Sequence, residues 1–64
     1  MSRLFSYTCR VVANNGATVT MLVGASSALA ALHNVRRSRR GDWLSIAVGT
    51  GEGDSFRPLA ETSR

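Results

Sequence analysis

The sequence predicts an α+β fold with a β-β-α-β layout, in which one helix packs on one face of a three-stranded antiparallel sheet of order 2-1-3. Apolar and polar residues alternate through much of residues 3–23, which is the period of a half-buried strand. Between residues 25 and 35 the apolar positions recur at steps of three and four, which is the period of a helix. A second alternating stretch at residues 43–48 supplies the third strand.

Two strands, at about residues 3–13 and 17–23, are expected to form a hairpin. Odd-numbered positions are apolar in both strands, so both apolar sets must lie on the buried face. A two-residue turn would place the two sets on opposite faces, whereas a three-residue loop at 14–16 keeps them together and pairs Val11 with Val19. The three-residue loop is therefore the predicted connection.

This register assigns roles to two residues of the hairpin. Gly16, the last residue of the loop, is expected to take the left-handed backbone conformation that such loops require. Cys9 is expected to be a small buried core residue. It is the only cysteine, so no internal disulfide can form, which fits a reducing, cytoplasmic setting.

The helix is expected at about residues 26–38, with Ser26 or Ser27 as its N-cap and Gly41 just beyond its end. Its apolar stripe consists of Ala25, Ala28, Leu29, Leu32 and Val35. Residues 1–48 thus form one predicted domain, and 49–64 are expected to be a glycine-rich loop and a C-terminal tail. A short edge strand around Phe56 is the alternative to a tail, since Pro58 limits ladder pairing.

At the predicted end of the helix, four of five consecutive positions are arginine: Arg36, Arg37, Arg39 and Arg40. The helix dipole favours cations there by about 0.3 to 1 kcal/mol each, which would explain one or two of them. Four repel one another, so they predict an anionic partner, either phosphate or an acidic protein surface. The formal net charge is +4 with no lysine in the chain, although a GC-rich genome would also replace lysine by arginine.

Two further residues extend this predicted binding site. Trp43, close behind the arginines, is predicted to be an aromatic anchor, with covering the end of the core as its alternative role. Arg10 is expected on the open face of the sheet, among serine and threonine residues that could carry a nucleic-acid backbone. Asp42 is expected to pair with one of the arginines.

Catalysis is not expected, because His33 and the four carboxylates form no recognisable catalytic or metal-binding pattern. No cofactor is expected either. The apolar run at residues 17–32 is shorter than the roughly 20 residues of a membrane span and contains polar positions. Membrane association is therefore only the third functional interpretation.

In size and in the layout from Arg3 to Val48, with no catalytic set, the chain resembles small phage-encoded proteins that inhibit host machinery, notably anti-CRISPR proteins and phage inhibitors of RNA polymerase. The resemblance implies a non-enzymatic protein that binds a host protein or ribonucleoprotein complex. Many such inhibitors are acidic mimics of DNA, whereas this chain is basic. The alternative is a basic DNA- or RNA-binding module, and pairing of two copies through a sheet edge is a further expectation left open.

Overall fold

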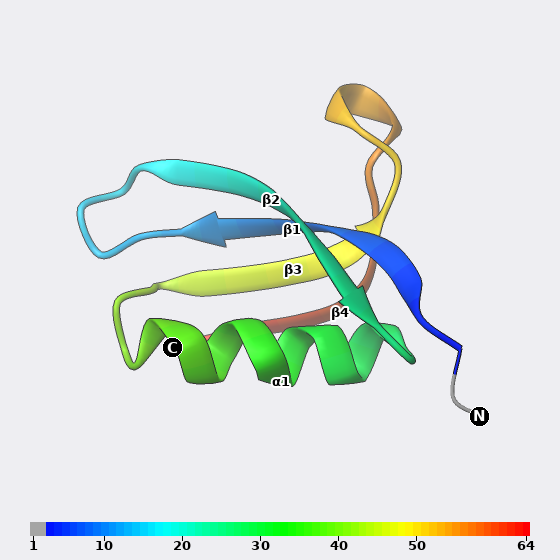
Figure 1. Cartoon of the computed structure of the whole chain (residues 1–64). Coiled ribbons are helices and arrows are strands. Elements are labelled where there is room, and N and C mark those ends of the chain that lie inside the picture. The colour runs from blue at the N-terminus through cyan, green and yellow to red at the C-terminus, as the bar shows by residue number, and fades with distance from the viewer. Residues whose placement is uncertain (1–2) are drawn as a thin grey trace.

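The computed structural model describes residues 3–64 and shows one helix lying on a four-stranded antiparallel sheet (Figure 1). The strands are β1 (Phe5–Val12), β2 (Thr18–Ala25), β3 (Ser45–Thr50) and β4 (Arg57–Ser63), the helix is α1 (Ala28–Arg39), and a short 3-10 turn η1 spans Gly53–Ser55. The strand order is β2-β1-β3-β4. The predicted α+β class and the order 2-1-3 are confirmed, and a fourth strand extends the sheet beyond β3.

The β1–β2 hairpin has the predicted register. Val11 lies opposite Val19, and the Ala13 N–H donates to the Ala17 carbonyl at 2.8 Å, which closes a three-residue loop. Gly16 has a φ of 88°, the left-handed conformation expected of it. The condition that both apolar sets lie on one face thus correctly predicted the loop length and the register of the hairpin.

Helix α1 begins after Ser27, whose Oγ accepts a hydrogen bond from the Ala30 N–H at 3.1 Å, so Ser27 rather than Ser26 is the N-cap. The helix ends where Arg40 and Gly41 both have positive φ angles, 46° and 91°. Gly41 adopts this conformation freely, whereas Arg40 is strained in it. The predicted stop at Gly41 is thus confirmed, with the C-cap one residue earlier.

The core lies between α1 and the sheet and is built from Cys9, Val11, Ala25, Ala31, Leu32, Val35, Trp43, Ile46 and Val48. The predicted place of Leu29 in the helix stripe is wrong, because its side chain is 58% exposed while Ala31 is fully buried. Residues two apart on a helix lie about 200° apart around its axis, so Leu29 and Ala31 cannot both face the sheet. The small Ala31 side chain faces the core instead.

Of the two alternatives for the C-terminal residues, the edge strand is confirmed and the tail is wrong, because residues 57–63 form β4 and pair with β3 along its length. The fold therefore continues past the predicted boundary at residue 48. Pro58 is tolerated because β4 is an edge strand, in which one row of backbone groups needs no partner within the sheet. The ladder also shifts at a bulge between Val48 and Gly49, opposite this end of β4.

Candidate anion-binding surface

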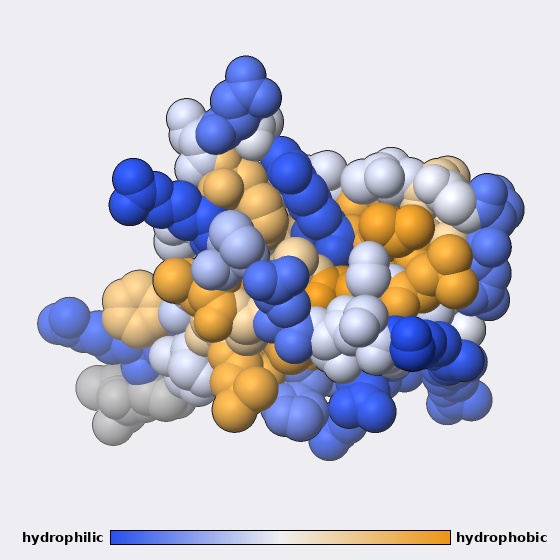
Figure 2. All heavy atoms as spheres, turned by 180° about the vertical axis from the view of Figure 1, so that it is seen from behind, coloured by the Kyte–Doolittle hydropathy of each residue, from blue (hydrophilic) through white to orange (hydrophobic). Residues whose placement is uncertain are grey.

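The four clustered arginines lie at one end of the molecule. Arg36, Arg37 and Arg39 belong to the last turn of α1 and Arg40 is its C-cap, so their charges are favoured by the helix dipole. The side chains of Arg36, Arg37 and Arg40 are exposed. Figure 2 views the molecule from behind, and hydrophilic side chains are gathered there along the right-hand end, where α1 terminates. The sequence prediction of a basic patch at the helix end therefore has its counterpart in the structure.

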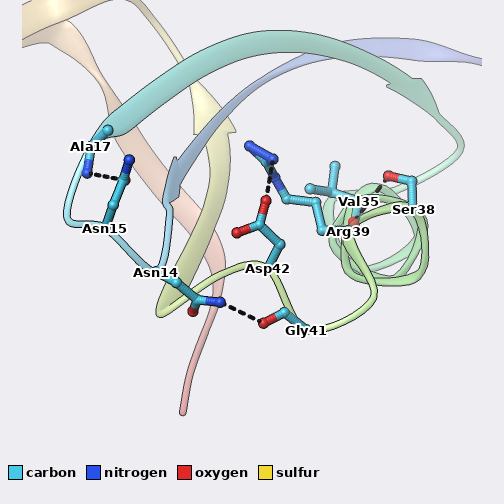
Figure 3. Close-up of polar contacts among 8 residues, drawn as sticks. All are labelled: Asn14, Asn15, Ala17, Val35, Ser38, Arg39, Gly41 and Asp42. Carbon is cyan, nitrogen blue, oxygen red and sulfur yellow. Dashed lines mark hydrogen bonds and ion pairs between the residues drawn. The ribbon is translucent and has the colours of Figure 1, made fainter.

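Arg39 differs from its three neighbours because it is turned toward the fold. Its side chain is only 21% exposed, and Nη1 lies 3.8 Å from Oδ2 of Asp42, as Figure 3 shows. This is the pairing expected of Asp42, and at the surface it contributes little to stability. Arg39 Nε is buried without a hydrogen-bond partner among residues 3–64. Arg39 is thus partly a structural residue, whereas Arg36, Arg37 and Arg40 are exposed and accessible to a partner.

The turn that carries Arg40 is tied to the hairpin loop. Asn14 Nδ2 donates a hydrogen bond to the Gly41 carbonyl at 3.2 Å (Figure 3). The hairpin loop is itself ordered by Asn15, whose side-chain oxygen accepts from the Ala17 N–H at 3.0 Å. These contacts join residues 14–16 to the end of α1 and hold the arginine-bearing turn against the sheet.

Of the two predicted roles of Trp43, the structure agrees with the alternative, in which the residue covers the end of the core. Its side chain is 4% exposed and belongs to the core. The residue precedes β3, which begins at Ser45, so the strand alternation does not determine where its side chain points. The guanidinium carbons of Arg36 and Arg64 lie 5.8 and 5.0 Å from the centre of the ring. The indole ring of Trp43 therefore makes cation–π contacts with both guanidinium groups.

Arg64 is a site residue that the sequence did not reveal. Its backbone N–H donates to the Leu44 carbonyl at 3.0 Å, which continues the β3–β4 pairing and brings the side chain over Trp43. Arg36 and Arg64 border an open hollow of about 460 Å³ whose other lining residues are Gly41, Trp43, Thr62 and Ser63. Guanidinium and hydroxyl groups donate hydrogen bonds well to phosphate and carboxylate oxygens. The arginine surface is hereafter Arg36, Arg37, Arg39, Arg40 and Arg64.

Arg10 lies on the open face of the sheet, as predicted, and is therefore separate from the arginine surface at the helix end. Cys9 and Val11 face the helix, so the intervening Arg10 lies on the opposite face of the sheet. Its Nη2 donates to the Gly53 carbonyl at 2.7 Å, and its guanidinium carbon lies 4.5 Å from the centre of the Phe56 ring. The glycine-rich loop therefore lies over the open face of the sheet, and these two contacts with Arg10 hold it there.

Neither a metal centre nor a membrane span is found in the part of the chain that the structure describes. Residues 3–64 contain no group of three or more His, Cys, Asp or Glu side chains placed to hold a metal ion. Over the same residues no helix is long and apolar enough to cross a membrane.

Cys9 is fully buried, as predicted, and burial raises the pKa of its thiol, an effect that the nearby Arg39 charge partly opposes. We expect Cys9 to react with 5,5′-dithiobis(2-nitrobenzoate) only when the fold opens, because the thiolate is the attacking species. Because the pKa of Cys9 is raised in the folded state, its contribution to the free energy of unfolding is present below the pKa of the unfolded thiol and is lost as the pH rises through the pKa of the folded thiol. Urea opens the fold and should accelerate the labelling of Cys9. Equal labelling rates with and without urea would contradict the burial of Cys9.

Comparisons with known proteins give no family assignment. No protein-family model matches the chain, and neither a curated protein nor a solved structure matches it. What the protein binds is therefore inferred from its arginine surface.

Proposed function

We propose that this chain is a non-enzymatic binding protein that inhibits or modulates a host protein or ribonucleoprotein complex. Its arginine surface binds an anionic area of that target. The observation that carries the proposal is an imbalance of charge at one end of the molecule. Five arginines lie there, and within residues 3–64 only Asp42 comes within ion-pair distance of any of them. Uncompensated like charges favour association with an anion.

The target class rests on the resemblance of the chain, in its size and in the layout of residues 3–48, to small phage-encoded inhibitors. A binding protein of this kind needs a rigid surface rather than a reactive centre. The arginine surface has that rigidity in part, because Arg36 and Arg64 rest on a buried ring and Arg39 is held beside Asp42. Holding the charged groups in place reduces the entropy lost on binding.

A DNA- or RNA-binding module is the second candidate, and the hollow between Arg36 and Arg64 favours it. Two guanidinium groups at the border of one hollow suit the oxygens of a phosphate. Trp43 is buried and offers no face for a base to stack on. Contacts of this type would be made to the backbone, with little sequence preference and a steep dependence on salt.

A charge-matched pair of variants tests both candidates. Arg36→Ala/Arg37→Ala removes two charges from the arginine surface, and Arg3→Ala/Arg57→Ala removes two exposed arginines elsewhere. Immobilised native protein should capture a partner from a bacterial lysate. The first variant should weaken that capture about ten-fold or more while the second leaves it unchanged, because two charge-assisted contacts are lost.

Fluorescence anisotropy with short labelled DNA and RNA separates the two candidates. Submicromolar binding that falls steeply over about 50 to 200 mM salt, and that Arg36→Ala/Arg37→Ala weakens, would establish the nucleic-acid module instead. Absence of that binding, together with capture that depends on the two arginines, would support the host-complex function. Equal behaviour of both variants in both assays would contradict any role for the arginine surface.

A further inference from the structure

The outer edge of β2 has no strand partner among residues 3–64. Strands β2 and β4 form the two edges of the sheet, and in the described part of the chain β2 pairs with β1 alone. The Ala13–Ala17 hydrogen bond sets the alternation of the ladder, so the odd residues of β2 direct their backbone groups to β1. The even residues Thr18, Thr20, Leu22 and Gly24 then present their N–H and C=O groups at the free edge. This edge is a template for another strand.

The two edges of the sheet differ in their protection. Strand β4 carries Arg57, Pro58 and Glu61 and has a bulge at Leu59, which are features that discourage further pairing. Strand β2 has the sequence TVTMLVGA, with no charge and no proline over eight residues. Its Leu22 side chain is 71% exposed. Residues with high strand propensity and an unprotected edge favour strand addition at β2.

We propose that two copies of this chain pair through β2 in antiparallel fashion, which joins their sheets into one eight-stranded sheet with both helices on the same face. In antiparallel pairing, residues directly opposite share a face, so a strand that pairs with itself must have compatible partners on both sides of its centre. Centred on Met21, the pairs are Val19 with Val23 toward the helices and Thr20 with Leu22 on the open face. Each strand is therefore complementary to its own copy.

Another register is less favourable. Centred on Leu22, the pairing would set Thr20 opposite Gly24, which has no side chain to contact, only two residues from the axis, whereas the Met21-centred register meets Gly24 only at the end of the strand, opposite Thr18. The Met21-centred register instead pairs two β-branched residues, Val19 and Val23, on each side of the axis. It also places Met21 opposite its copy as a close, non-hydrogen-bonded pair, between the hydrogen-bonded Thr20–Leu22 pairs.

The charge distribution permits a second copy to occupy this edge. Each chain has a formal net charge of +4, so two copies repel each other in general and can associate only through a surface that carries no charge. The uncharged β2 is such a place, and Arg10, opposite Thr20 in the neighbouring strand, is held away by the Gly53 carbonyl and the Phe56 ring. A contact between single strands lies at the small end of protein interfaces, below about 1,200 Å², so we expect a dissociation constant of roughly 10 to 100 μM.

Sedimentation equilibrium of the full chain tests the proposal. Over about 10 μM to 1 mM the mass should rise from 6.8 kDa toward twice that value. Leu22→Lys should raise the dissociation constant at least ten-fold, because it brings two new cations to the seam. Leu59→Lys is the matched control, since that side chain is 60% exposed on the protected edge, and it should change nothing. Both variants should melt as the native protein does, because both positions are exposed.

Amide hydrogen exchange, followed by NMR at low and high concentration, locates the contact. The amides of Thr20 and Leu22 should become protected as the concentration rises, whereas Met21 is already bonded to β1 and should change less. A chain that stays monomeric to about 1 mM would overturn the proposal. So would a dimer that Leu59→Lys disrupts, or one in which Thr20 and Leu22 gain no protection. Because these measurements need no other ligand, they are independent of the proposed function.

Discussion

Replacing Gly49 by alanine is expected to lower the free energy of unfolding by about 3 kcal/mol or more. Gly49 lies in β3 opposite Pro58, beside the bulge. A Cβ atom added there would overlap the carbonyl oxygen and carbon of Arg57 and the Cα of Pro58. These are backbone atoms of the paired strand, so they can move away only if β4 separates from β3. A domain of this size is stabilised by only a few kcal/mol, and the substitution should leave it largely unfolded.

Gly24→Ala is the matched control, because a Cβ added at Gly24 in β2 meets no atom within 4 Å. Thermal unfolding followed by circular dichroism should show a loss of the cooperative transition in Gly49→Ala and a nearly unchanged midpoint in Gly24→Ala. Similar midpoints for the two variants would contradict the close approach of β4 to β3. In any folded fraction of Gly49→Ala, the indole N–H resonance of Trp43 should shift, because Arg64 follows β4 onto the ring.

The hairpin and β4 differ in how far the sequence could predict them. The β1–β2 register follows from two apolar sets that must share one face, a condition that the three-residue loop satisfies and a two-residue turn does not. Strand β4 has no such pattern, because Ala60 is its only apolar side chain packed against the core. Its position depends on a close backbone approach at Gly49, a contact that no local pattern encodes. Pro58 argued against a strand at the same time.

The arginine surface was predictable to the extent that it is contiguous in the chain. Arg36, Arg37 and Arg40 are brought together by one helix end, so their spacing alone placed them. Arg64 reaches the same surface only through the β3–β4 pairing. Arg10 lies on the open face as the strand alternation predicted, but its contacts with Gly53 and Phe56 could not be predicted, because the approach of the glycine-rich loop to that face is also non-local.

Trp43→Ala is the second substitution with a large expected effect, about 3 to 5 kcal/mol of lost stability. The ring is 4% exposed and packs in the core, so its removal leaves a cavity between α1 and the sheet. Arg36 and Arg64 would also lose the surface on which they rest. An exposed anchor would behave differently, because truncating it would weaken partner binding without affecting the fold.

Leu44→Ala is the control for Trp43→Ala, since Leu44 is the next residue and is 45% exposed. We expect it to cost less than about 1 kcal/mol, as other surface substitutions do. Far-UV circular dichroism in urea gives both values without relying on the fluorescence of the residue that is removed. If Trp43→Ala unfolds at the same urea concentration as the native protein, Trp43 is exposed in solution. An exposed Trp43 would act as the aromatic anchor that the sequence predicted, and its ring could stack on a base of a nucleic-acid partner.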